Sequence, residues 1–124
     1  MKIPISFDRV DAARFKSAVV EGQAVKLSSG TDYTEVDTVT AATDYVVGFA
    51  KDMDRSAGQD GDIYREGGSA YALAAATALA KGARVKIDAS GKLVAAGNSE
   101  AAIGYTLAAI AANEIGAIYF QRGS

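Results

Sequence analysis

The chain has 124 residues, 13 of them Lys or Arg and 15 Asp or Glu, so its length predicts one domain and its charge of −2 offers no basic surface for nucleic acid. The absence of His and Cys excludes disulfide bonds, thiolate or imidazole metal ligands, and the commonest general base. No apolar run approaches the roughly 20 residues needed to cross a bilayer, and Asp8 and Arg9 interrupt the stretch where a signal peptide is apolar, so we expect synthesis in the cytoplasm without export by that route.

Residues 1–20 predict an N-terminal arm. The single proline, Pro4, lies in the segment KIPISF at 2–7, where apolar residues alternate with polar or small ones as in an extended chain. The alternating apolar residues are Ile3, Ile5 and Phe7. Good helix formers then separate widely spaced apolar residues over 8–19, which predicts a short helix before the main domain.

The rest of the chain alternates β-branched segments with glycines and turn residues. AVKL at 24–27 and RVKI at 84–87 alternate aliphatic residues with Lys, and a turn of Asp, Ser and Gly makes residues 84–96 a hairpin. Further strands are expected within 31–40, 44–51, 61–67, 70–74, 101–108 and 116–123. The alanine-rich stretch 69–82 also has helical propensity, so a helical turn competes with part of it.

One phrase occurs twice, because EGQAVKLSSG at 21–30 returns as KGARVKIDASG at 81–91. Three glycine matches keep the same order in both halves: Gly22 and Gly82, Gly48 and Gly104, and Gly61 and Gly116. Each glycine alone indicates only a turn, but their order predicts half-repeats at 22–67 and 82–122 within a single β domain, 21–124. Because neither copy buries its own apolar face, we expect a mainly β fold in which the two close on each other into one small β-barrel.

Catalytic motifs are missing from the sequence, which has neither a G-x-S-x-G elbow nor a phosphate-binding glycine cluster. Paired carboxylates remain as an option, but the chain has no Trp to form a sugar platform, so we expect no enzyme and no cofactor. The acidic loop 52–62 fails as an EF-hand, since Ala57 stands where Gly is needed and Ile63 where Glu is needed. We expect a solvated loop there, with a weak cation site as the alternative.

The second copy carries a wider pattern of glycine and aliphatic positions. It consists of Ala80-Lys81-Gly82, Val85-Lys86-Ile87-Asp88, Gly91-Lys92-Leu93-Val94, Ile103-Gly104-Tyr105, Ala111-Ala112-Asn113-Glu114, Gly116 and Ile118. This pattern resembles the small capsid decoration, or head cement, proteins of tailed bacteriophages. The resemblance covers residues 20–122, and the first copy fits it more loosely from Glu21 to Gly67.

The resemblance implies a structural virion protein without catalytic residues. Such proteins sit on the outer face of an assembled head, bind the major capsid protein, stabilise the capsid lattice, and usually act as homotrimers, although dimers and monomers occur. We therefore expect no nucleic-acid or membrane partner, and synthesis in the host cytoplasm. The alternative is a small glycan- or ligand-binding β-barrel module. That alternative needs aromatic residues at one mouth of the barrel, whereas the six Tyr are distributed along the chain.

The arm provides the candidate contact residues, Lys2, Ile3, Ile5, Phe7 and Arg9. An extended segment with one apolar face adds to a neighbour's sheet edge, and flanking cations meet acidic loops. We expect this arm to reach a capsid subunit or an adjacent protomer, and the alternative is an edge strand within its own barrel. With 26 alanines and only four Phe, the core is thin, which also favours a homo-oligomer.

Overall fold

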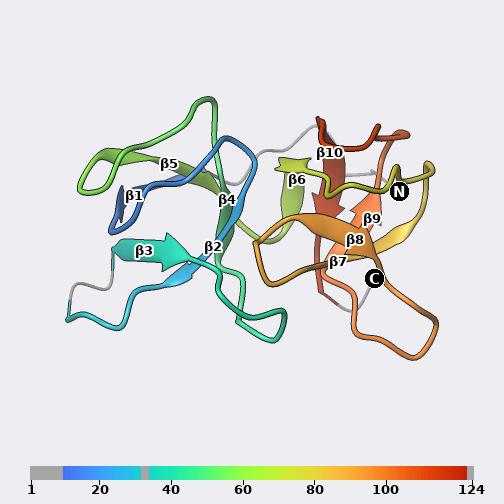
Figure 1. Cartoon of the computed structure of the whole chain (residues 1–124), viewed down its shortest axis with the longest axis horizontal. Helices are drawn as coiled ribbons and strands as arrows, with labels where there is room; N and C mark the ends of the chain where they lie inside the picture. Colours follow the sequence, from blue (N-terminus) through green and yellow to red (C-terminus); the bar gives the residue numbers. More distant parts are fainter. Residues whose placement is uncertain (1–9, 32–33, 123–124) are drawn as a thin grey trace.

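The computed structural model of the chain describes residues 10–31 and 34–122, in which every regular element is a β-strand. The strands form two groups side by side along the long axis of the molecule, one from each half of the chain (Figure 1). Their bounds are β1 (Val10–Phe15), β2 (Ala24–Leu27), β3 (Glu35–Thr38), β4 (Gly48–Ala50), β5 (Asp60–Tyr64), β6 (Gly68–Leu73), β7 (Arg84–Ile87), β8 (Leu93–Ala95), β9 (Gly104–Thr106) and β10 (Ile115–Phe120). Within these described ranges, no helix is long and apolar enough to cross a membrane.

The first group is a closed barrel with strand order β1-β3-β2-β4-β5, and we call it the first barrel. Strand β1 runs parallel to β3, where Phe15 pairs with Val36, and antiparallel to β5, where Val10 pairs with Tyr64. The other three pairs in this barrel are antiparallel. Because β1 has one partner on each side, the barrel leaves no open sheet edge along that strand.

The second group, which we call the second sheet, repeats the topology of the first barrel. Its strand order, β6-β10-β9-β7-β8, is the same cyclic order opened between β6 and β8. One isolated parallel bridge, Ala74 to Leu93, spans this opening at the place where the first barrel pairs Phe15 with Val36. The internal repeat expected from the glycine order is therefore present in the strand pairing, and it begins at β1 and β6.

Two expectations are wrong. Residues 10–15 form β1 instead of part of a helix, because Ala13 and Phe15 alternate into the interior and burial outweighs helix propensity. The halves do not close into one barrel, because each half pairs its strands internally. The strand expected at 70–74 is confirmed as β6. The domain boundary after residue 20 stays a prediction.

Matching positions build the two interiors, and every one of them is buried. The pairs are Ala13 and Ala72, Phe15 and Ala74, Val19 and Leu79, Val25 and Val85, Val36 and Leu93, Ala50 and Thr106, and Ile63 and Ile118. In the first barrel, the large ring of Phe15 lies beside the smaller Val36. At the matching positions of the second sheet, the small Ala74 lies beside the larger Leu93. The two interiors thus keep close packing by different distributions of volume.

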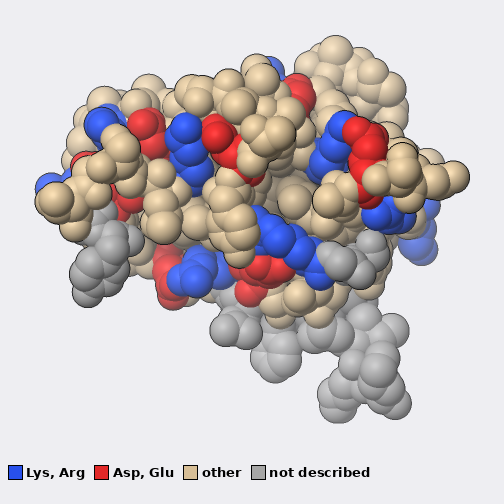
Figure 2. Space-filling model, turned by 90° about the horizontal axis from the view of Figure 1, so that it is seen from below, with Lys and Arg blue, Asp and Glu red and all other residues tan. Residues whose placement is uncertain are grey.

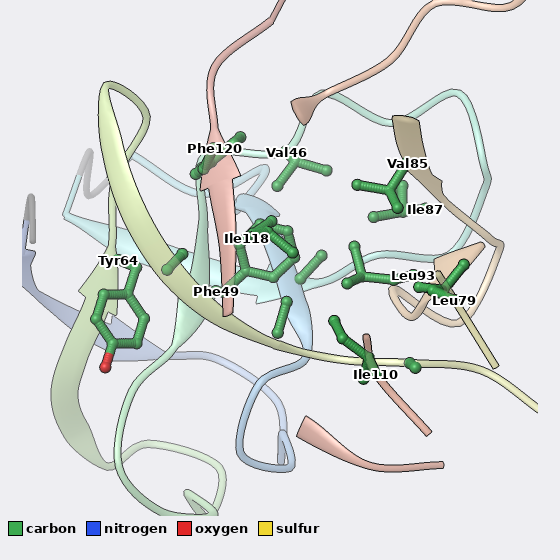
Figure 3. Close-up of a cluster of buried hydrophobic side chains, with 14 of the residues drawn as sticks. Val46, Phe49, Tyr64, Leu79, Val85, Ile87, Leu93, Ile110, Ile118 and Phe120 are labelled. Atoms are coloured by element: carbon green, nitrogen blue, oxygen red, sulfur yellow. The ribbon is translucent and has the colours of Figure 1, made fainter. Parts of the chain in front are cut away.

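Phe49 joins the two halves, because its side chain lies on the outer face of β4 and packs into the second sheet. Its ring meets the ring of Phe120 edge to face, with centroids 5.1 Å apart. Phe49 and Val46 belong to the hydrophobic cluster that fills the second sheet, beside Ile118 and Leu93 (Figure 3). The interior of the first barrel forms a separate cluster. The first barrel therefore supplies part of the core of its neighbour.

Gly48 and Gly104 occupy matching positions at which two strands come very close. A Cβ on Gly48 would lie 2.6 Å from the carbonyl oxygen of Tyr64, and a Cβ on Gly104 would lie 2.0 Å from that of Tyr119. Both distances are shorter than any ordinary carbon–oxygen contact, so a side chain fits at neither site without moving backbone. A glycine inside a strand often marks such a close backbone approach.

Candidate interaction surfaces

The first barrel is open at one end, where a cavity of about 300 Å³ reaches into its interior. We call this cavity the barrel mouth. Its lining residues are Asp11, Ala12, Ala13, Leu27, Thr34, Val36, Val47, Ile63 and Arg65. They come from β1, the end of β2, β3 and β5 and from the segments beside them. The alternation that turns Val36 and Ile63 inward places these buried side chains at the base of the mouth.

The corresponding end of the second sheet is filled instead of open. The counterparts of six mouth residues lie in the same cluster as Phe49 and Val46, and these counterparts are Ala70, Ala72, Ile87, Leu93, Ile118 and Phe120. Ile87 is 2% exposed, whereas its counterpart in the mouth, Leu27, is 55% exposed. The same position in the repeat is therefore core in one half and surface in the other.

Charged side chains line the rim of the mouth. At the mouth, Arg65 pairs with Asp11. Outside the mouth lining, the Nε of Arg14 lies 3.1 Å from an oxygen of Asp60. All four side chains are more than half exposed, so these pairs add little stability. On the face in Figure 2, basic and acidic side chains are likewise interspersed without a large patch of one sign. This face therefore has no strong field of one sign that would attract a charged partner.

Arg122, which follows β10, makes several contacts that join the two halves. Its guanidinium pairs with Glu66, donates to the carbonyl oxygen of Val46, and stacks 4.0 Å from the centre of the Tyr45 ring. The backbone N–H of Arg122 also donates to the Glu66 carboxylate, with 2.7 Å between the nitrogen and the oxygen. Because the side chains of Arg122 and Glu66 are half-buried, their ion pair is stronger than an ordinary surface pair.

A Lys–carboxylate pair recurs in both halves. Lys26 lies 3.1 Å from Asp44 in the first, and Lys86 pairs with Glu100 in the second. Hydrogen bonds from the Thr40 backbone N–H and from Lys26 lower the pKa of Asp44. Lys86 lowers the pKa of Glu100, helped by a backbone N–H. Both carboxylates organise the loop that leads into the strand bearing the close-approach glycine.

The acidic loop 52–62 uses several of its carboxylates internally. Asp52 accepts a hydrogen bond from Lys51 at 2.8 Å and thereby raises the pKa of that amine. Asp54 accepts from the backbone N–H of Glu21 at 2.8 Å. In the part of the chain that the structure describes, no three acidic residues gather in a metal-binding arrangement. These contacts fit the interpretation as a solvated loop.

The five arm residues expected to make contacts, Lys2, Ile3, Ile5, Phe7 and Arg9, lie outside the described residues. Sequence reasoning did not find the barrel mouth. A signal was present, because Asp11 and Arg65 stand where the second copy has Ala70 and Phe120. That signal required aligning β1 with β6, which the expected helix prevented.

The comparison with protein families gives a match to the phage cement protein family over residues 7–119. The chain belongs to this family. Cement proteins are structural components of the phage head and typically lack enzymatic activity, which agrees with the resemblance seen in the sequence. No curated protein sequence matches the chain.

Among solved structures, the chain is similar to the N base of the head fiber gp8.5 of bacteriophage phi29. The identity is 18%, the TM-score is 0.68, and the match covers 93% of this chain and 95% of the other. At this identity the similarity establishes a shared fold. The fold of this cement protein therefore has a counterpart of similar length in the N base of the phi29 head fiber.

Proposed function

We propose that this chain is a decoration protein that binds the outer face of an assembled phage head and stabilises the capsid lattice. The observation that carries this proposal is membership of the cement family over residues 7–119. The similar fold of the phi29 head fiber base, from a protein of a phage head, supports it. Its partner is the major capsid protein, and it needs no cofactor.

The protein acts as a homo-oligomer, and a trimer is the state that the family resemblance implies. Several large apolar side chains remain exposed on the described surface, namely Val10, Val20, Leu27, Tyr45, Met53, Tyr71 and Ile115. Together with the open mouth, these side chains leave apolar surface for contacts with neighbouring copies or with the capsid.

The glycan-binding alternative has less support. Such modules bind sugars against aromatic rings, and within the described residues no aromatic side chain lines the barrel mouth. Tyr64 and Tyr119 occupy matching positions next to other aromatic rings, as expected for packing.

The arm provides the anchor in this proposal. An extended segment with Ile3, Ile5 and Phe7 on one face adds to a sheet edge, with Lys2 and Arg9 available to acidic loops. Deleting residues 1–7 is then expected to leave a folded protein that no longer decorates heads. Circular dichroism and melting temperature report the fold, and sedimentation of undecorated heads with the protein reports binding.

A matched pair of full-length variants separates the two parts of the arm. Replacing Ile3, Ile5 and Phe7 with Ser tests the apolar face, and replacing Lys2 and Arg9 with Ala tests the charges. The first variant is expected to abolish decoration and the second to weaken it in a salt-dependent way. Full occupancy by the deletion variant would show that the arm is not the anchor, whereas unfolding would place the arm in the barrel.

Lattice stabilisation is a separate readout. Heads filled with DNA are expected to release it at a higher temperature when decorated than when bare, because a ligand of the closed lattice stabilises that state. Equal release temperatures at full occupancy would contradict a cement role even if the protein binds.

A further inference from the structure

The first barrel plugs the second sheet, but nothing among the described residues plugs the first barrel. Phe49 and Val46 occupy the filled end of the second sheet. The barrel mouth has the same lining positions and remains a cavity of about 300 Å³. A cavity of about 150 Å³ is already enough to hold a benzene molecule in a protein interior. The mouth therefore has room for an aromatic side chain such as the one that fills its counterpart.

The plugging face also exists twice. In the first barrel it is the cross-strand row Ala24, Phe49 and Tyr64, which is 0%, 0% and 5% exposed. The matching row in the second sheet runs through Arg84, Tyr105 and Tyr119 on β7, β9 and β10. The rings of these two tyrosines lie 5.6 Å apart and are only half-buried. In one copy of the chain, the plugging face of the first barrel already fills the end of the second sheet. The plugging face of the second sheet is only half-buried, and the mouth of the first barrel is open.

We propose that the barrel mouth receives the Tyr105–Tyr119 face of a second copy of this chain, in a head-to-tail contact. The proposal rests on the self-association proposed above and names its contact surface. The contact repeats between copies the arrangement that already joins the two halves within one copy. Such a contact is heterologous, so it generates a closed ring or, where the rotation does not close, a filament.

The chemical differences between the used and the unused surfaces match each other. Phe49, which has no polar atom, packs against Phe120 in the filled end, and Ala70 belongs to the same cluster. The unused plug has Tyr105 in place of Phe49 and Arg84 in place of Ala24, and the unused mouth has Asp11 and Arg65 in place of Ala70 and Phe120. A tyrosine hydroxyl donates to a carboxylate and accepts from a guanidinium. A polar atom is therefore added on both sides of the same contact.

The test uses engineered cysteines, because the chain has none of its own. One preparation carries Arg65→Cys and another carries Tyr105→Cys. Mixed at tens of micromolar under oxidising conditions, they are expected to give a covalent heterodimer, since only a contact between copies joins two single variants. The control mixture pairs Tyr105→Cys with Ala57→Cys, an exposed position in the loop at the far end of β1.

The proposal expects at least ten times more heterodimer in the first mixture than in the control. It also expects little homodimer from Arg65→Cys alone, because position 65 meets position 105 in a head-to-tail contact. Equal yields in the two mixtures overturn the proposal. A dominant Arg65→Cys homodimer overturns it as well, because it indicates a two-fold contact.

A second variant blocks the mouth without using cysteine. Leu27→Arg places a long side chain in the mouth, and Ala57→Arg is the matched control. Sedimentation is expected to show monomers for the first and the wild-type oligomer for the second, with circular dichroism confirming the fold of both. An unchanged mass with a shifted melting temperature overturns the proposal and indicates that the chain's own N-terminal segment fills the mouth.

These results separate the inference from the proposed function. An oligomer without the 65–105 link overturns the contact and leaves self-association standing. A wild-type monomer at tens of micromolar overturns both. Binding to heads is measured on its own, so a wild-type chain that fails to decorate them contradicts the cement role whatever its oligomeric state.

Discussion

The first barrel and the second sheet share a topology and seven matched interior positions, but they differ in what lies at one end. In the second sheet, that end is filled by aromatic and aliphatic side chains from the first barrel. In the first barrel it is an open mouth rimmed by Asp11 and Arg65. The comparison shows that a duplicated unit keeps its backbone and its interior while its ends take different partners.

The largest expected effect comes from breaking the plug. Phe49→Ala removes a fully buried ring from a cluster shared by both halves, and we expect a loss of about 3–5 kcal/mol in unfolding free energy. Tyr105→Ala, at the matching position, is expected to cost far less in a monomer, because its ring is only half-buried. Denaturant unfolding of both variants checks this, and equal losses would contradict the asymmetry.

The second-largest effect is expected from side chains placed at the two close-approach glycines. We expect Gly48→Val and Gly104→Val each to destabilise the fold by about 1–3 kcal/mol through crowding. Gly104→Val should be the worse of the two, because its Cβ would lie 2.0 Å from a backbone oxygen, against 2.6 Å at Gly48. Thermal melts with Ala57→Val as the control test this order, and unchanged melting temperatures would remove the argument for matched positions.

Replacing Arg55 is expected to change the unfolding free energy by less, and to raise it. Arg55 stands where the second sheet has the buried Ile110, over Gly61, and its Nε is buried without a hydrogen-bond partner. Replacing it with Ile, as in the other half, is expected to stabilise the protein by about 1 kcal/mol, since an unsatisfied buried donor is costly. A lower melting temperature for Arg55→Ile would show that the guanidinium makes a favourable contact.

The smallest effect concerns pH and the recurring Lys–carboxylate pairs. The pKa values of Asp44 and Glu100 are lowered in the folded state, so their stabilising contribution is complete above the ordinary carboxyl range, about pH 4. That contribution is lost as the pH falls through the lowered values. Melting temperatures of Asp44→Asn and Glu100→Gln should therefore depend less on pH below about pH 4 than wild type. Parallel curves would contradict the linkage.

Strands with a strong alternating pattern were predictable from the sequence. AVKL and RVKI form β2 and β7 at the expected residues, because Val25, Val85 and Ile87 turn inward and are buried while the lysines between them lie on the other face. Strand β1 was not predictable in the same way. It has only Ala13 and Phe15 turned inward, and its copy has alanines at both positions, so composition hid the repeat there.

The number of barrels depends on information that the repeat does not contain. Glycine and aliphatic positions specify strands and turns, but they do not specify whether a strand pairs within its own half or with the other half. The decisive pairs, β1 with β5 and β6 with β10, join residues about 50 positions apart. The barrel mouth follows from those pairings, which is why sequence reasoning proposed only the arm as a contact surface.

Strand β10 has a consequence for synthesis of the protein on the ribosome. It is the last described strand, and it pairs with both β6 and β9 and carries Phe120 against Phe49. The first barrel has all its strands once residue 64 leaves the ribosome. The apolar face around Phe49, however, stays exposed to solvent until β10 has been synthesised. During that interval a nascent chain exposes an aggregation-prone surface. Truncation before β10 is therefore expected to yield insoluble protein even though the whole first barrel is present.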